Sequence, residues 1–177
     1  MSNTLKRILI GIIGIPAILY ISYLGGIYFF AFCLFVQSLC FWEFIKMFKN
    51  INYKPYIYSS VLMSAVIISS FVYFNQYFKY TVVIVVILLL VIEFVSRKEH
   101  PLVNSGLVMF GLIYITLPFA LLHELDKDYI QVYLLLLLIW ANDSFAFFGG
   151  KYFGKHKFSK ISPNKTWSGA IAGLLGA

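Results

Sequence analysis

Long apolar runs separated by short polar segments are the feature that most constrains how this 177-residue chain can fold. A helix that crosses the hydrocarbon core of a membrane needs roughly 20 residues, most of them apolar. A soluble domain is excluded because 61% of the residues are hydrophobic and only 12% are charged, whereas about a quarter are charged in soluble proteins. The runs cover approximately residues 8–24, 27–47, 56–74, 80–95, 102–122 and 129–148.

These runs predict an all-α fold, a polytopic membrane helix bundle with six complete transmembrane helices. A seventh helix begins near Trp167 and reaches Ala177 after some eleven residues, or about 16 Å of helix, so we expect only the start of a seventh crossing. Gly25 and Gly26 leave room only for a turn between the first two helices. Residues 1–177 then form a single membrane-integral domain, with no space for a soluble one.

The basic residues predict the orientation of the bundle. If the N-terminus is cytoplasmic, all 14 Lys and Arg residues except Lys79 and Lys127 fall in cytoplasmic segments, as the positive-inside rule describes. The net charge of +7 then favours an anionic membrane surface or a phosphorylated substrate, and we expect no nucleic-acid partner. The outer loop at 123–128 holds three acidic residues, and we assign no role to it.

Three carboxylates lie within the apolar runs, where each costs a few kcal/mol on insertion scales. Glu43 and Glu93 are within four residues of predicted helix ends, and we interpret both as interfacial, paired carboxylates. Asp143 is deeper in its run and has Asn142 and Ser144 as polar neighbours. A short carboxylate at that depth is expected to pair with another helix or to bind a cation or a substrate.

The segment at 149–169 follows Asp143 and contains five lysines, one histidine and four glycines but no acid. Glycines allow close approach of the backbone to a ligand, and lysines supply cations for phosphate oxygens. Phosphate recognition is one interpretation, and a basic loop held against anionic headgroups is the other. The spacing of glycine and lysine does not match a P-loop.

A carboxylate facing such a segment at one membrane surface suits phosphoryl or nucleotidyl transfer. In this hypothesis Asp143 holds a divalent metal, and the metal and the lysines neutralise a triphosphate and its leaving group. Lys165 acts as a point charge on phosphate, and Ser162 and Thr166 donate hydrogen bonds. We interpret His156 as a solvated loop residue.

Two ordered elements carry a resemblance to a known family. Residues 142–157 read Asn-Asp-Ser-Phe-Ala-Phe-Phe-Gly-Gly-Lys-Tyr-Phe-Gly-Lys-His-Lys, and residues 161–169 read Ile-Ser-Pro-Asn-Lys-Thr-Trp-Ser-Gly. The first is similar to the Asp, Gly and Phe-Gly-Lys pattern of the bacterial phosphatidate cytidylyltransferases, or CDP-diglyceride synthases. The second resembles their Ser-Pro-x-Lys-Thr-x-x-Gly element, and residues 42–44, Trp-Glu-Phe, are weakly similar as well.

The resemblance implies transfer of CMP from CTP to phosphatidic acid with Mg²⁺, which gives CDP-diacylglycerol and pyrophosphate in phospholipid biosynthesis. It implies a multi-pass protein of the bacterial inner membrane, among membrane lipids, with its active face cytoplasmic, and a homodimer is conceivable for such a site. Asp143 and Lys165 are the expected catalytic residues, and Asp143 is the expected metal ligand. The expected substrate-binding residues are Asn142, Ser144, Lys151, Lys155, Lys157, Ser162, Asn164 and Thr166.

Members of this family are longer and end with a signature rich in Lys, Asp, Gly and His, which includes carboxylates that bind the catalytic metals. We therefore expect this chain to be the front two-thirds of the family's domain, truncated at its C-terminus and without those partner carboxylates. The truncation puts its activity in question.

Two other functions compete with this one. A non-catalytic membrane protein or remnant would bind acidic lipid through the basic loop. An anion transporter would use Asp143 at a midplane site, but Asp143 lies near one face and the Pro and Gly interruptions do not repeat between halves.

Overall fold

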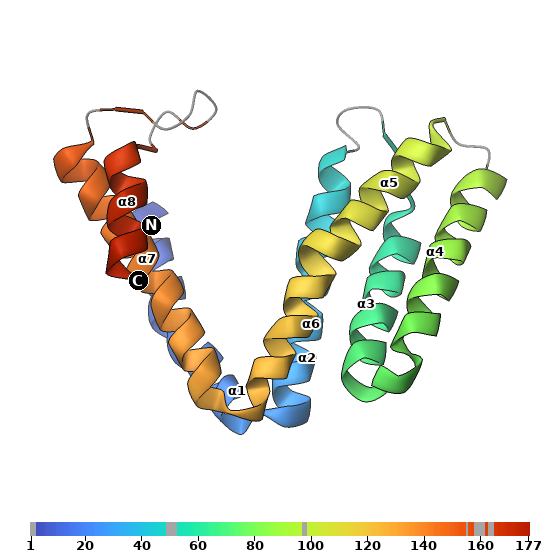
Figure 1. Ribbon diagram of the computed structural model, residues 1–177, viewed down its shortest axis with the longest axis horizontal. Helices are drawn as coiled ribbons and strands as arrows, with labels where there is room; N and C mark the ends of the chain where they lie inside the picture. Colours follow the sequence, from blue (N-terminus) through green and yellow to red (C-terminus); the bar gives the residue numbers. More distant parts are fainter. Residues whose placement is uncertain (1–2, 49–52, 97–98, 155, 158–161, 163–164) are drawn as a thin grey trace. The chain divides into compact units, whose positions relative to one another are not determined.

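The structure is a computed structural model that describes residues 3–48, 53–96, 99–154, 156–157, 162 and 165–177. In these residues the chain is helical and forms no strand, apart from an isolated bridge between Lys157 and Thr166 (Figure 1). Four helical segments are long and apolar enough to cross a membrane, namely Gly26–Phe48, Asn75–Val95, Pro101–Lys127 and Tyr129–Phe153. The predicted all-helical membrane protein is confirmed at this level.

A helix forms at each apolar run that the sequence analysis identifies. Most of the ends differ from the predicted ones by only a few residues, because charged residues and glycines bound each run. The elements are α1 (Asn3–Leu24), α2 (Gly26–Phe48), α3 (Ile57–Tyr73), η2 (Asn75–Tyr77), α4 (Phe78–Val95), α5 (Pro101–Gly111), η3 (Leu112–Thr116), α6 (Leu117–Glu124), η4 (Leu125–Lys127), α7 (Tyr129–Phe153) and α8 (Trp167–Gly176).

The helix expected at 102–122 contains a π-helical segment, η3, between α5 and α6. Pro118 is the second residue of α6, just beyond this segment, and its missing N–H interrupts the regular hydrogen bonding of an α-helix. Short π segments of this kind allow a helix to continue past such an interruption. The apolar run at 102–122 does not by itself predict this π-helical segment.

The chain divides into two compact units, Met1–Lys127 and Asp128–Ala177. In the first unit α3 and α4 run side by side and are joined through η2 (Figure 1). The core of this unit lies between α2, α3, α4 and the α5–η3 segment. Its buried side chains are Phe41, Phe44, Ile45, Ile57, Met63, Ile67, Val85, Leu89, Val108 and Leu112.

Glu93 is buried in the first unit, with 1% of its surface exposed. One carboxylate oxygen accepts a hydrogen bond from the backbone N–H of Tyr56 at 3.1 Å, next to the first residue of α3. Its partner is thus the backbone N–H that precedes α3, no ion pair is formed by Glu93 in the described residues, and its interfacial position stays a prediction. Glu43 is exposed, and in the described part of the chain it forms no ion pair.

The turn between α1 and α2 forms at the predicted glycines, which have φ values of +60° at Gly25 and +53° at Gly26. Glycine adopts this left-handed conformation without the steric cost that other residues incur. The N–H of Gly26 donates to the carboxylate of Asp126 at 2.7 Å. The segment at 123–128, which has no predicted role, thus holds this turn.

Candidate functional site

The candidate site lies in the second unit, which consists of α7, α8 and the connection between them. Asp128 caps the start of α7, since its side chain accepts a hydrogen bond from the N–H of Ile130 at 3.0 Å. α7 then continues to Phe153, five residues beyond the predicted end at 148. Gly149, Gly150 and Lys151 therefore lie within a helix, and the expectation that they belong to a loop with ligand-binding N–H groups is wrong.

Close packing between α7 and α8 explains why the helix continues through two glycines. A Cβ atom added at Gly149 would clash with the Cβ of Ala172, and one at Gly173 would clash with the side-chain oxygen of Asn142. A Cβ at Gly169 would lie 2.8 Å from the backbone oxygen of Ala146. Small residues at helix contacts let backbones approach closely in membrane proteins. The glycines are thus required for the pairing of these two helices.

α8 begins at Trp167, as predicted, and Thr166 is its N-cap. The hydroxyl of Thr166 accepts a hydrogen bond from the N–H of Gly169 at 3.2 Å, and the N–H of Trp167 donates to the carbonyl of His156 at 3.1 Å. Ser162 contributes its carbonyl, which accepts from the N–H of Lys165 at 3.0 Å. These bonds fix the segment that carries Lys165 against the start of α8.

A cavity of about 870 Å³ opens on the pair of helices. Five residues that the sequence analysis selects line it together, although they come from both helices and the connection. These residues are Asn142, Asp143, Lys151, Lys165 and Thr166.

The remaining selected residues are not in this lining. Ser144, Lys157 and Ser162 are described but do not line the cavity. Lys155 and Asn164 lie outside the described residues, as do Lys49, Arg97, Lys98 and Lys160, which contribute to the predicted charge asymmetry. The roles assigned to all of these side chains stay predictions.

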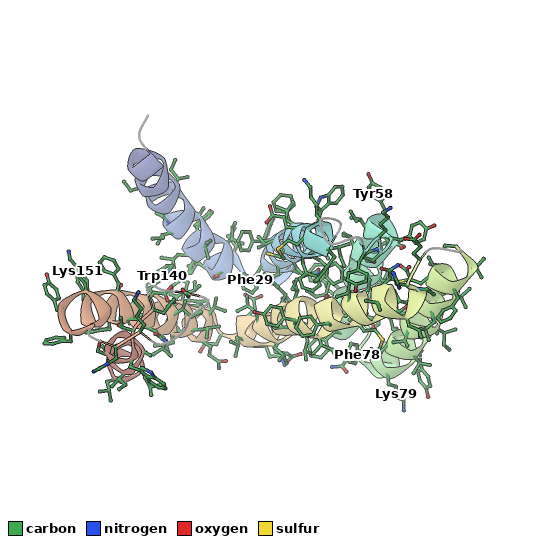
Figure 2. All side chains as sticks on the ribbon, turned by 90° about the horizontal axis from the view of Figure 1, so that it is seen from above. Phe29, Tyr58, Phe78, Lys79, Trp140 and Lys151 are labelled. Atoms are coloured by element: carbon green, nitrogen blue, oxygen red, sulfur yellow. The ribbon has the colours of Figure 1, made fainter. Side chains whose placement is uncertain are left out.

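The cavity contains one carboxylate and two ammonium groups. Asp143, Lys151 and Lys165 are all exposed, and no ion pair joins them within the described ranges. The Nζ atom of Lys151, near the end of α7 (Figure 2), lies 6.0 Å from the centroid of the Phe147 ring and 5.9 Å from that of Tyr152. Such contacts between a cation and the faces of aromatic rings are electrostatically attractive. The lining is therefore net positive, which suits an anionic ligand.

The side chains that could bind a metal can be compared with the ligands that the expected Mg²⁺ ion requires. No group of three or more His, Cys, Asp or Glu side chains is suited to a metal ion among the described residues. Asp143 is the single carboxylate in the cavity lining. Mg²⁺ is commonly held by one or two carboxylates together with substrate phosphates and water. The residues thus fit a Mg²⁺ ion that is shared with a phosphorylated substrate, and do not fit one held by protein ligands alone.

Five further residues line the cavity and were not selected from the sequence. Most are small, because the cavity floor is the contact between the two helices. One sequence signal that could have identified this helix contact is the spacing of four between Gly169 and Gly173, which is typical of close helix pairing in membranes. The five residues are Ala146, Phe147, Gly150, Gly169 and Ala170.

Comparison with known proteins identifies relatives of the chain. The phosphatidate cytidylyltransferase of Rickettsia bellii (strain RML369-C) is 35% identical over 130 residues, which are 70% of this chain and 55% of that protein. The enzyme of that name from Rickettsia felis is 35% identical over 131 residues, 70% of this chain and 56% of that protein. The one from Haemophilus influenzae is 37% identical over 101 residues, 51% of this chain and 35% of that protein.

This chain thus spans about half the length of the first two curated relatives. No solved structure matches it significantly. The sequence profile described as the Cytidylyltransferase family matches residues 5–177, which include both units and every residue that lines the cavity. The chain therefore belongs to the cytidylyltransferase family.

Proposed function

We propose that the chain takes part in the transfer of CMP from CTP to phosphatidic acid, which gives CDP-diacylglycerol and pyrophosphate for phospholipid biosynthesis. Membership of the family and the names of the relatives support this activity. The observation that carries the proposal is the cavity of the second unit, where Asp143, Lys151 and Lys165 surround a space large enough for phosphate groups. The proposal covers only the part of the active site that Asp143, Lys151 and Lys165 form.

In this reaction a phosphate oxygen of phosphatidic acid attacks the α-phosphorus of CTP. The bond from that phosphorus to the oxygen that bridges to the β-phosphate breaks, and its electrons leave with pyrophosphate. The ammonium groups of Lys151 and Lys165 would bind the phosphates and stabilise the negative charge that develops on the leaving group. The hydroxyl of Thr166, which accepts from the N–H of Gly169 and lies 3.4 Å from the hydroxyl of Ser168, would donate a hydrogen bond to a phosphate oxygen.

The lysines, rather than the N-terminus of α8, supply most of the positive charge in this proposal. Two N–H groups in the first turn of α8 already have partners, that of Trp167 with His156 and that of Gly169 with Thr166. Mg²⁺, when bound, would neutralise phosphate charge and polarise the bond to be broken. Asp143 would hold it, with substrate oxygens completing the coordination.

The number of membrane crossings and their orientation are also proposals. We infer six membrane crossings and the start of a seventh, in the bacterial inner membrane, with the N-terminus and the active face cytoplasmic. α1 has 22 residues and α3 has 17, so they extend about 33 Å and 26 Å, against a hydrocarbon core of about 30 Å. The clustering of Lys and Arg on one side supports the orientation. A homodimer and the lack of a nucleic-acid partner stay predictions.

The test measures CDP-diacylglycerol formation from labelled CTP and phosphatidic acid in membranes that contain the chain. Asp143→Asn and Lys165→Ala should each lower the rate by about a hundred-fold or more, as losses of charge-stabilising groups commonly do. Lys79→Ala is the matched control, because Lys79 is exposed and lies in the first unit, outside the cavity. Its rate should equal that of the unmodified chain.

Equilibrium binding of CTP is measured on the same variants, because it reports on the cavity without requiring turnover. Weaker binding in Lys165→Ala but not in Lys79→Ala supports the proposal. A chain that neither binds CTP nor forms product refutes it. If that chain still binds acidic vesicles, and Asp143→Asn binds them equally well, the non-catalytic alternative is favoured.

A further inference from the structure

A groove of about 990 Å³ lies on the first unit, and none of the residues of the proposed function lines it. It runs between the last turns of α2 and the η3–α6 segment. Leu39 and Met47, which mark its extent along α2, are separated by about 12 Å of helix. Pro118 and Phe119 form part of the facing wall, and we call this the α2–α6 groove.

The α2–α6 groove is lined by apolar side chains over most of its length, and charged side chains line it towards the end of α2. Leu39, Pro118 and Phe119 line its apolar part, whereas Glu43 and Lys46 lie near the C-terminal end of α2. α2 is one of the helices that can cross a membrane, so its end lies close to the membrane surface. In the proposed topology, in which α2 crosses the membrane, the groove runs from the interfacial region into the hydrocarbon.

A second cavity, of about 610 Å³, adjoins the charged end of the groove. Trp42 and Lys46 line both cavities, and the second one adds Lys54 from the connection to α3 and Tyr58 from its first turn. The rings of Trp42 and Tyr58 meet edge to face at a centroid distance of 5.5 Å. Tyr58 extends outward from α3 in Figure 2. Tryptophan and tyrosine are enriched where membrane meets water.

We propose that the two cavities together bind one anionic phospholipid. An acyl chain occupies the α2–α6 groove, and the headgroup phosphate lies between Lys46 and Lys54, with Trp42 at the junction. The lining favours an anionic headgroup, because its charged side chains are two lysines, Lys46 and Lys54, and one carboxylate, Glu43. A phospholipid with a negatively charged headgroup, such as phosphatidylglycerol, suits this lining.

The site is distinct from the proposed catalytic cavity, with which it shares no residue. A lipid fits better than a peptide segment, because the apolar part of the groove, apart from the hydroxyl of Tyr114, offers no polar side chain for a peptide backbone. A lipid bound at this site would cover the exposed apolar side chains of the α2–α6 groove.

Trp42 provides the probe for the test. The full chain with Trp140→Phe and Trp167→Phe keeps Trp42 as its single tryptophan. It is placed in vesicles that contain either brominated phosphatidylglycerol or brominated phosphatidylcholine, whose bromines quench tryptophan fluorescence on contact. Circular dichroism verifies that each variant is folded.

The expected result is stronger quenching by brominated phosphatidylglycerol than by brominated phosphatidylcholine. Lys46→Gln and Lys54→Gln should each lower the relative affinity for the anionic lipid about five-fold, the effect of one basic side chain near an anionic surface. Lys79→Gln is the matched control, since Lys79 lies over the Tyr80 ring at 5.0 Å, and Figure 2 shows it on the opposite side of the unit from Tyr58. It should leave the preference unchanged.

Three results would overturn the proposal. Equal quenching by both lipids would mean that the site does not select an anionic headgroup. A preference that survives in the double variant of Lys46 and Lys54 would assign it to other residues. No quenching by either lipid would mean that something other than lipid, such as a second copy of the chain, covers Trp42.

Discussion

Replacement of Gly169 by alanine tests whether the packing of α7 and α8 sets the shape of the cavity. The added Cβ would lie 2.8 Å from the backbone oxygen of Ala146, whereas ordinary contacts begin at 3.4 Å. It would also lie 3.1 Å from the hydroxyl of Thr166 and 3.2 Å from the Cα of Gly150. A carbonyl in the middle of a helix cannot rotate away, so α8 must move by about 0.6 Å, the shortfall from ordinary contact.

The change has two opposing effects on stability. Overpacking costs about 1–3 kcal/mol, whereas alanine in place of glycine within a helix contributes up to about 1 kcal/mol. We therefore expect a net loss of about 0–3 kcal/mol in the free energy of unfolding. Ligand binding should suffer more, since misplacement by about 1 Å can lower a rate about a hundred-fold. CTP affinity and product formation should fall at least ten-fold.

Thermal unfolding in detergent and equilibrium binding of CTP give the two measurements. Gly106→Ala is the matched control, because no atom lies within 4 Å of a Cβ placed at this helical position. It should bind CTP normally and be equally or more stable. If Gly169→Ala binds CTP as well as Gly106→Ala does, the helix contact does not set the cavity geometry and the reasoning fails.

Two further substitutions test individual hydrogen bonds. Glu93→Ala removes the buried carboxylate that accepts from the N–H of Tyr56 and should lower the free energy of unfolding by about 1–3 kcal/mol. Glu93→Gln keeps an acceptor oxygen and should lose less, and equal losses in titrations with denaturing detergent would contradict this assignment. Thr166→Val removes the N-cap of α8 and should cost about 1 kcal/mol. Thr166→Ser should retain most of that stability in thermal unfolding, and a loss as large as that of valine would argue against a capping role.

The sequence predicts the helices well because each apolar run ends at residues that water solvates or at glycine. Trp167 is a correct start for α8, since Thr166 just before it is a good N-cap. The end of α7 is predicted too early, because Gly149, Gly150 and Lys151 resemble a loop when considered alone. They remain helical because α8 packs on the two glycines, and a contact between two segments cannot be inferred from the composition of one.

The buried position of Glu93 could not be predicted from its place near a helix end. Proximity to an end favours an exposed carboxylate, but the residue that precedes α3 covers this one and donates a hydrogen bond to it. The role of Asp126 was missed for a similar reason. Its carboxylate holds the turn at Gly26, which is 100 residues earlier in the chain. Long-range partners of this kind leave no local pattern.

The candidate site is more predictable, since its residues come from two helices that are consecutive in the chain. Asn142, Ala146 and Gly150 are spaced by four, as are Asp143, Phe147 and Lys151, which places the two adjacent rows on one face of α7. Ser144 has the right chemistry but the wrong spacing, and it does not line the cavity. Helical periodicity is therefore a signal in the sequence that distinguishes Asp143 from Ser144.

The charges in the cavity support a metal-binding role for Asp143 rather than a role as partner of the lysines. Across the described part of the chain, Asp143 forms no ion pair, although Lys151 and Lys165 line the same cavity. If Asp143 neutralised one lysine, the cavity would attract phosphate more weakly. The positive charge left on the cavity lining would then be much smaller than the negative charge of a triphosphate. A divalent cation held by Asp143 would reverse this effect, because it would add positive charge next to the phosphates and leave both lysines to bind them.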